Sequence, residues 1–247
     1  MMRIHATILL LLLFACGRST PAPSELTVAA AANLTAVFQR LGPQFEAQTS
    51  IHPVFSFAST AQLARQIESA APFDLFAAAD ALHVDELDRK GLLVPGSRAV
   101  YATGILALWI PPQSTAAVTR IEELASPDVR VIAVANPELA PYGQAAIETL
   151  QHLGILARVK AKIVYAENIN MAKQYGMSNN ADAVFIAYSL VLHEGGRVIQ
   201  VDEKLHQPIV QELGIVAKSR HRDAAQKFAQ FLLTGAGRSV LLSSGYR

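Results

Sequence analysis

The stretch from Leu26 to Thr35, LTVAAAANLT, joins a strand pattern to the start of a helix. Residues 26–29 predict a buried strand, and apolar residues recur at helical spacing from Leu34 onward. The turn between them consists of small residues and Asn33. A strand that runs through such a turn into a helix is typical of α/β proteins with a mostly parallel sheet flanked by helices.

The same order of elements repeats along the chain. Residues 54–57 and 75–78 predict two more strands, each followed by a helical pattern, and a second series begins after the apolar run 101–110. Pro43 lies inside the first helical pattern and predicts a kink or a restart there. Further strands are expected at residues 129–135, 162–165, 183–187, 197–201 and 209–217.

Two α/β series joined by long extended crossings predict two lobes with a cleft between them. The expected boundaries assign residues 25–102 and 208–247 to lobe I and residues 103–207 to lobe II. Ligands of such sheets bind beyond the carboxyl ends of the strands, where loops lead into helices. We therefore expect the functional residues in the turns that follow strands.

The first residues have the pattern of an export signal. Arg3 precedes an apolar run over residues 6–14 that is too short to cross a bilayer, so residues 1–15 are predicted to be a signal peptide. The run ends in Leu-Phe-Ala-Cys at Cys16, which resembles a bacterial lipobox and predicts a lipidated, membrane-anchored protein with residues 16–24 as a linker. The alternative is an ordinary signal peptide in which Cys16 is incidental.

Composition and motifs exclude several classes of protein. The 247 residues include 21 Lys and Arg against 20 Asp and Glu, a balance that provides no broad cationic surface for nucleic acid. The single Cys excludes an internal disulfide framework, and no GxSxG, HExxH, Walker or GxGxxG motif occurs. Asp74 and Asp80 flank a predicted strand at a spacing that favours turn and cap positions over an acid/base pair. We expect a binding protein, not an enzyme, with no cofactor and no side-chain metal site.

Two of the predicted turns place polar side chains at helix starts. Asn33 lies in the first turn, and Ser59 and Thr60 lie in the second. Each of these residues could simply cap its helix. Together they favour an anion site, because a helix N-terminus offers free N–H groups and about half a positive charge.

Five blocks in this order resemble the exported molybdate-binding proteins of bacterial ABC-type importers. The blocks are residues 26–35, 55–67 (FSFASTAQLARQI), 71–80 (APFDLFAAAD), 135–143 (ANPELAPYG) and 183–188 (AVFIAY). The resemblance implies a two-lobed periplasmic binding protein fold, type II-like, with the ligand in the cleft. It also implies a periplasmic monomer that binds molybdate and tungstate and delivers them to a membrane permease.

The resemblance further implies a ligand set. The matching positions are Asn33, Ser59, Thr60, Tyr142, Ile169 and Tyr188. Tyr142 and Ile169 are expected to donate through the backbone, and Tyr142 replaces a small residue that is common there. Neutral donors suit molybdate, which has no proton to donate near neutral pH.

Three other functions are possible from the sequence. A receptor for sulfate or another tetrahedral oxyanion would need the same kind of donors. An exported hydrolase is disfavoured because no nucleophile–base arrangement is visible. A lipid-anchored structural protein would leave the donor-rich turns without a purpose.

Overall fold

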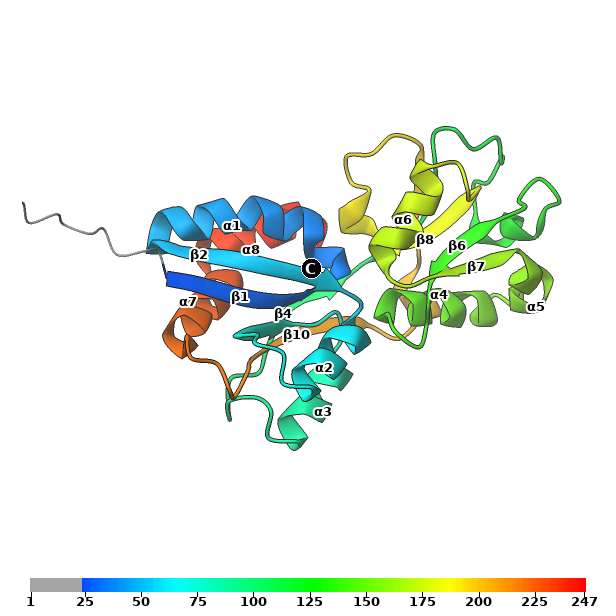
Figure 1. The fold of residues 1–247 in the computed structure, drawn as a ribbon. Coiled ribbons are helices and arrows are strands. Elements are labelled where there is room, and N and C mark those ends of the chain that lie inside the picture. Colours follow the sequence, from blue (N-terminus) through cyan, green and yellow to red (C-terminus); the bar gives the residue numbers. More distant parts are fainter. Residues whose placement is uncertain (1–23) are drawn as a thin grey trace, which may run out of the picture.

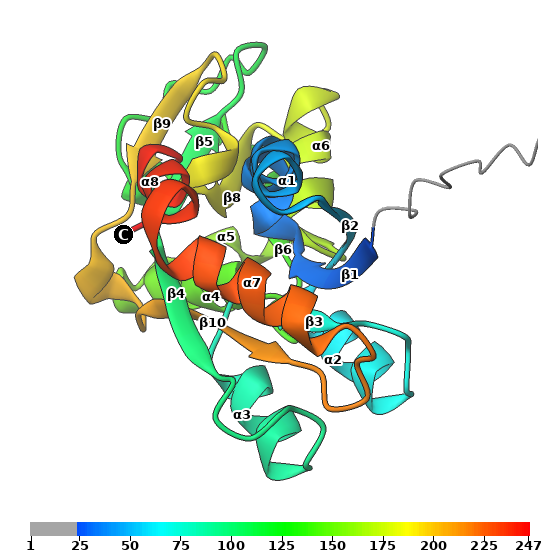
Figure 2. The ribbon, with the colours of Figure 1, turned by 90° about the vertical axis from the view of Figure 1, so that its left-hand side faces the viewer.

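The computed structural model describes residues 24–247 and contains two five-stranded sheets, each flanked by helices (Figures 1 and 2). The predicted signal peptide 1–15 and Cys16 lie outside the described residues. Within residues 24–247, no helix has the length and apolar character needed to cross a membrane.

The first sheet contains both ends of the described chain. Its strands are, in spatial order, β2 (Ile51–Ala58), β1 (Ser24–Ala31), β3 (Leu75–Ala77), β10 (Ile209–Ile215) and β4 (Ala99–Gly104). Only β10 runs antiparallel to its neighbours. One face is covered by α1 (Thr35–Thr49), α7 (Arg222–Leu233) and α8 (Gly235–Ser243), and the other by α2 (Thr60–Glu68) and α3 (Leu82–Arg89) (Figures 1 and 2).

The second sheet has the same design with different strands. Its spatial order is β7 (Ile163–Ala166), β6 (Ile132–Ala135), β8 (Ala183–Ala187), β5 (Leu106–Ile110) and β9 (Arg197–Gln200). Here β5 is the antiparallel strand. The helices α4 (Pro141–His152) and α5 (Leu156–Val159) lie below this sheet in Figure 1, and α6 (Ile169–Met177) lies above it. Short 3-10 turns occur at η1 (Ala32–Leu34), η2 (Ile121–Ala125), η3 (Lys160–Lys162), η4 (Tyr188–Leu190) and η5 (Glu203–Leu205).

The chain passes between the sheets twice. Ile105 alone separates β4 of the first sheet from β5 of the second, and residues 201–208 lead back from β9 to β10. Each antiparallel strand therefore adjoins a crossing. We use lobe I for the part that carries the first sheet and lobe II for the part that carries the second.

The apolar run 101–110 does not form one element. It contributes the end of β4 to one sheet and all of β5 to the other, with the change of sheet at Ile105. Residues 101–104 at the end of β4 are mostly buried and β5 is fully buried, so the hydropathy of the chain is alike on the two sides of the crossing. In contrast, β8 has the predicted bounds, Ala183–Ala187.

The helix does not restart at Pro43, because α1 is a single helix from Thr35 to Thr49. A proline inside a helix removes one hydrogen bond and crowds the preceding turn. Here aromatic packing holds the helix on both sides of the proline: the Phe38 ring centroid lies 5.2 Å from that of Phe55, and the Phe45 centroid lies 5.0 Å from that of Phe228. Tertiary packing thus outweighs the local cost.

The first turn of α4 is seated directly on the end of β6. A Cβ atom added to Gly143 would lie 2.0 Å from the carbonyl oxygen of Ala135, which is backbone and cannot move aside alone. Although Ala is favoured over Gly in a helix interior by about 1 kcal/mol, we predict that Gly143→Ala destabilises the protein by roughly 1–3 kcal/mol through overpacking.

Urea unfolding of Gly143→Ala measures this prediction. The neighbouring exposed variant Gln144→Ala is the control and should stay within about 0.5 kcal/mol of the wild type. A Gly143→Ala protein as stable as the wild type would show that α4 is not tightly packed against the end of β6 at Gly143.

Candidate functional site

A small cavity lies between the lobes, where strands lead into helices. Its walls come from η1 and α2 of lobe I and from α4 and α6 of lobe II, which face one another across the lobe boundary (Figure 1). Its volume is only about 10 Å³, whereas pockets for drug-sized ligands have roughly 300–1,000 Å³. The cavity therefore suits a ligand of few atoms. Besides alanines and Pro141, it is lined by Asn33, Ser59, Thr60, Tyr142, Asn168 and Ile169.

The hydroxyl groups at the start of α2 differ in what they are free to do. Ser59 is the N-cap residue, and its Oγ donates to Oε1 of Gln62 at 2.6 Å, so its hydroxyl hydrogen is already used. Thr60 Oγ1 instead accepts from the backbone N–H of Ala79 at 3.1 Å, which leaves its own hydroxyl hydrogen available. Thr60 is thus the better placed of the two to donate to a ligand.

The Asn33 carboxamide points into the protein. Its Nδ2 donates to Gln211 Oε1 at 3.1 Å and to Tyr246 Oη at 3.2 Å, and these two bonds use both of its hydrogens. Asn33 lies in η1, and the first N–H groups of a helix have no acceptor within the helix. Asn33 can therefore serve a ligand as a donor through its backbone, while its side chain anchors the turn.

Lobe II contributes two helix starts. Tyr142 is the second residue of α4, after Pro141, and its side-chain hydroxyl turns away from the cavity to accept from Gln211 Nε2 at 2.9 Å. Ile169 is the first residue of α6, which is capped by Asn168 Oδ1 accepting from the N–H of Met171 at 3.0 Å. In both helices the residue at the cavity can offer a backbone N–H.

Tyr188 is the one predicted ligand residue that does not line the cavity. It begins η4, directly after β8, and its side chain is half-buried. A Cβ atom added to Gly245 would lie 2.9 Å from its ring, so Tyr188 packs against the C-terminal residues. Its role as a ligand residue stays a prediction.

Asp74 and Asp80 occupy turn and cap positions, as predicted. Asp80 Oδ1 accepts from the N–H of His83 at 2.9 Å, at the beginning of α3. Asp74 accepts from the N–H of Thr27 at 2.9 Å and from the Ser219 hydroxyl at 2.7 Å. Neither carboxylate lines the cavity.

The cavity is electrically neutral in its side chains. None of its lining residues is Asp, Glu, Lys, Arg or His. Burial raises the pKa of Tyr246 to about 12 and holds the pKa values of Tyr101 and Tyr142 well above 10, so the phenols behind the cavity keep their protons at neutral pH. The positive potential comes from the starts of α2, α4 and α6, each carrying about half an elementary charge.

Hydrogen bonds join the lobes at the rim of the cavity. These contacts run from the N–H of Ala61 to the carbonyl of Leu139 (3.2 Å), from Asn170 Nδ2 to Thr35 Oγ1 (2.7 Å), and from the Gln62 amide to the Glu167 carboxylate. Each joins a residue at or near a helix start of lobe I to one in lobe II. The structure therefore shows the two lobes closed on each other around the cavity.

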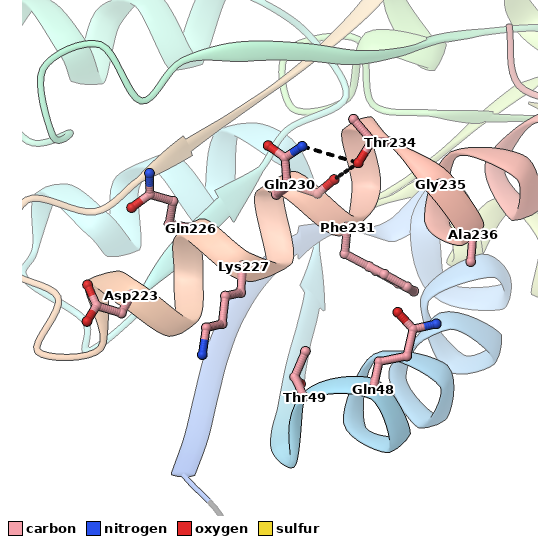
Figure 3. Close-up of a pocket in the computed structure, with 10 residues that line it drawn as sticks. All are labelled: Gln48, Thr49, Asp223, Gln226, Lys227, Gln230, Phe231, Thr234, Gly235 and Ala236. Atoms are coloured by element: carbon pink, nitrogen blue, oxygen red, sulfur yellow. Dashed lines mark hydrogen bonds between the residues drawn. The ribbon is translucent and has the colours of Figure 1, made fainter.

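A larger hollow of about 640 Å³ lies on the outer surface of lobe I, between the end of α1 and the turn from α7 to α8 (Figure 3). In Figure 3, Lys227 points from α7 toward the end of α1, whereas Gln226 points away from it. Thr234 Oγ1 accepts from Gln230 Nε2 at 3.2 Å and donates to the Gln230 carbonyl at 2.8 Å, so these polar groups satisfy one another. The candidate ligand site is the cavity between the lobes, where polar donors are buried.

Asn168 is a cavity residue that the sequence interpretation missed. Its signal was present, since an Asn immediately before apolar residues at helical spacing is typical of an N-cap. Gln211 and Tyr246 behind the cavity had no such signal, because they lie 178 and 213 residues from Asn33. In the part of the chain from residue 24 onward, no cluster of three or more His, Cys, Asp or Glu residues could hold a metal ion.

Comparisons with known proteins agree with this geometry. The family model described as bacterial extracellular solute-binding protein matches residues 26–247. The molybdate-binding protein ModA of Rhodobacter capsulatus is 33% identical, over 99% of this chain and 96% of the relative. The putative ABC transporter substrate-binding lipoprotein YvgL of Bacillus subtilis is 28% identical, over 90% of this chain and 85% of the relative.

A solved structure gives the same result for the fold. The periplasmic molybdate-binding protein of Azotobacter vinelandii superimposes with a TM-score of 0.86 at 30% identity, covering 90% of this chain and 98% of that one. The predicted two-lobed periplasmic binding protein fold is thereby confirmed, and the family is one of binding proteins and not of enzymes. The chain belongs to the bacterial extracellular solute-binding proteins and, within them, to the ModA family.

Proposed function

We propose that this protein captures molybdate, and equally tungstate, in the cavity between its lobes and delivers it to the permease of an ABC importer. The observation that carries the proposal is a closed cavity at which helix starts from both lobes meet without a charged side chain. The names of the relatives, which specify molybdate binding, support the choice of ligand.

The chemistry of the ligand fits such a cavity. Molybdate is a tetrahedral dianion without a proton, so each of its oxygens accepts hydrogen bonds and none donates. Backbone N–H groups at helix starts and a hydroxyl can hold such an anion because they carry partial positive charge. Hydrogenphosphate brings a proton that would find no acceptor, at a cost of about 1–3 kcal/mol for the unpaired donor.

The proposed ligand set comes from both lobes. In lobe I, Asn33 donates through its backbone and Thr60 through its hydroxyl, with Ser59 as the capping neighbour. In lobe II, Tyr142 and Ile169 donate through their backbones. Because the set is complete only when the lobes are closed, binding and closure are coupled. Tungstate carries the same charge and nearly the same shape, so we expect no discrimination against it.

Sulfate is the competing ligand. It has the charge and shape of molybdate but is smaller, and the same donors would serve it. Only the fit between the anion and the cavity walls can separate the two, so selectivity is a matter for measurement on the intact protein.

The protein is proposed to work in the periplasm, anchored through a lipid on Cys16. The lipobox-like sequence and the lipoprotein named among the relatives support this location. Cys16 itself lies outside the described residues, eight residues before β1 begins at Ser24. A short tether of this kind would keep the lobes close to a membrane permease.

A thermal-shift panel of molybdate, tungstate, sulfate and phosphate tests the function. A ligand at 100 times its dissociation constant stabilises the folded protein by about 2.7 kcal/mol, which corresponds to a rise in Tm of roughly 5–11 °C for a chain of this size. We expect this rise with molybdate and tungstate, less with sulfate and none with phosphate. A larger shift with sulfate would identify a sulfate receptor, and no shift with any anion would refute the oxyanion function.

The free hydroxyl of Thr60 gives a second prediction. Thr60→Ala should weaken molybdate binding by about 1.5–3 kcal/mol, the range for a hydrogen bond to a charged group. Ser59→Ala should lower stability by about 1 kcal/mol through loss of the cap, with a smaller effect on affinity. Calorimetric titration gives both affinities.

Thr60→Ser is the matched control, since it keeps the hydroxyl, and it should bind nearly as well as the wild type. Equal losses of affinity in the two Ala variants would mean that both hydroxyls reach the anion. Full affinity in Thr60→Ala would remove Thr60 from the ligand set.

The lipid anchor is tested by fractionation. Cys16→Ser removes the chain's only thiol, so the variant should move from the membrane fraction to the soluble periplasmic fraction, as followed by immunoblotting. The folded lobes are unaffected by this change, and molybdate affinity should be retained. A wild-type protein that is already soluble, with a mature N-terminus other than Cys16, would contradict the anchor.

A further inference from the structure

A chain of buried polar side chains joins the lobes behind the cavity. Gln211 of β10 is at its centre and has no exposed surface. Its Oε1 accepts from Asn33 Nδ2 at 3.1 Å and from Tyr101 Oη at 2.9 Å, and its Nε2 donates to Tyr142 Oη at 2.9 Å. Asn33 and Tyr101 belong to lobe I, whereas Tyr142 belongs to lobe II. One side-chain amide thus touches a residue of the ligand cavity from each lobe.

The backbone around Gln211 is shaped for this contact. The pairing of β10 with β4 shifts register between Gln211 and Glu212, and such bulges re-aim a side chain. A Cβ atom added to Gly104, the last residue of β4, would lie 2.2 Å from Tyr142 Oη and 2.6 Å from Gln211 Nε2. Residue 104, next to the crossing from lobe I to lobe II, must therefore be glycine for the Tyr142 hydroxyl to reach the Gln211 amide.

The hydrogen bond from Gln211 to Tyr142 crosses between the lobes in the closed state that the structure shows. In the closed state both groups are buried, and a buried polar group without a partner is costly. The bond from Gln211 to Asn33 lies within lobe I and fixes the η1 turn at the same time. Loss of the amide would therefore weaken the closed state and release both cavity residues.

We propose that Gln211 is a positioning residue for ligand binding, whose amide holds Asn33 and Tyr142 in the placement at which their backbone N–H groups face one anion. It is a latch formed on closure, and it sets the lifetime of the bound ligand more than the rate of capture. The inference rests on the proposed function for its ligand, and on the structure alone for the contact between lobes.

The latch predicts a kinetic signature. Encounter takes place with the open form, before the latch is made, so association should be nearly unchanged. In Gln211→Leu, which keeps the approximate size but forms no hydrogen bond, the dissociation rate of molybdate should rise roughly 10- to 100-fold. Tyr142→Phe removes the partner hydroxyl and should act similarly, and the double variant should be little worse than either single one. Release of isotopically labelled molybdate into excess unlabelled anion measures the rate.

Thr149→Val is the matched control for loss of stability. Thr149 is fully buried in α4, and its hydroxyl donates to the Ala145 carbonyl at 2.8 Å without touching the latch. This variant should lose stability and keep the wild-type dissociation rate. If Gln211→Leu loses stability in the same way with an unchanged dissociation rate, Gln211 is a packing residue and the proposal is wrong.

Gln211→Glu provides a milder variant and a different readout. Its carboxylate can only accept hydrogen bonds and repels the dianion, whereas its neutral acid form keeps a donor. The dissociation rate of this variant should therefore rise as pH increases from about 5.5 to 8.5, because burial raises the pKa of a carboxyl group into this interval. The dissociation rate of the wild type should stay constant over this pH range, since Tyr101, Tyr142 and Tyr246 remain protonated. A flat profile in Gln211→Glu would count against the latch.

A ligand-free measurement separates this proposal from the proposed function. Spin labels at exposed Gln226 in α7 and Gln151 in α4 report the distance between the lobes. Gln211→Leu should shift the distance distribution of the ligand-free protein toward longer values. No binding of any oxyanion by the wild type would refute the function and leave this result intact. A distribution unchanged by Gln211→Leu, with and without molybdate, would overturn the latch.

Discussion

An anion can leave water for a closed cavity without a counter-ion only if every one of its oxygens meets a hydrogen-bond donor. This constraint explains the arrangement of the molecule. Neutral donors are individually weak, so several must converge, and helix starts supply them as backbone N–H groups in fixed directions. No single sheet could surround the ligand in this way. Two lobes of the same design can, because each presents the ends of its strands to the other.

Much of the fold could be predicted because its signals are local. Buried strands such as β8 and helix stops such as Gly91 and Gly154, both with positive φ, follow from patterns of a few residues. The change of sheet at Ile105 could not be located, since strands on both sides are apolar for the same reason. That α1 continues past Pro43 without a restart could not be decided either, because the phenylalanine contacts that hold it there come from β2 and α7.

The candidate site was predictable only where its residues carry a local signal. Asn33, Ser59 and Thr60 stand at helix starts after strands, where residue type and position both point to donors. Tyr142 and Ile169 are proposed to serve through the backbone, so their side chains carry no chemical signal, and only the family resemblance indicated them. Tyr188 directly follows β8, as expected, but it is not among the residues that line the cavity, so its part in binding stays a prediction. Gln211 depends on a bulge, which residue patterns do not reveal.

In the proposed ligand set most donors are main-chain N–H groups, so some positions of the cavity tolerate substitution much better than others. At Ile169 a different side chain would leave the proposed backbone donor in place, so this position can vary while the ligand stays the same. The positions that cannot accept a larger residue lie behind the cavity, where Gly104 and Gly143 have no room for even a methyl group. If the proposed ligand set is right, a chain can differ from its relatives at about two thirds of its positions, as this one does from the 33% identical relative, and still bind the same ligand. A new specificity would then arise more readily through changes at the lobe crossings than through the lining itself.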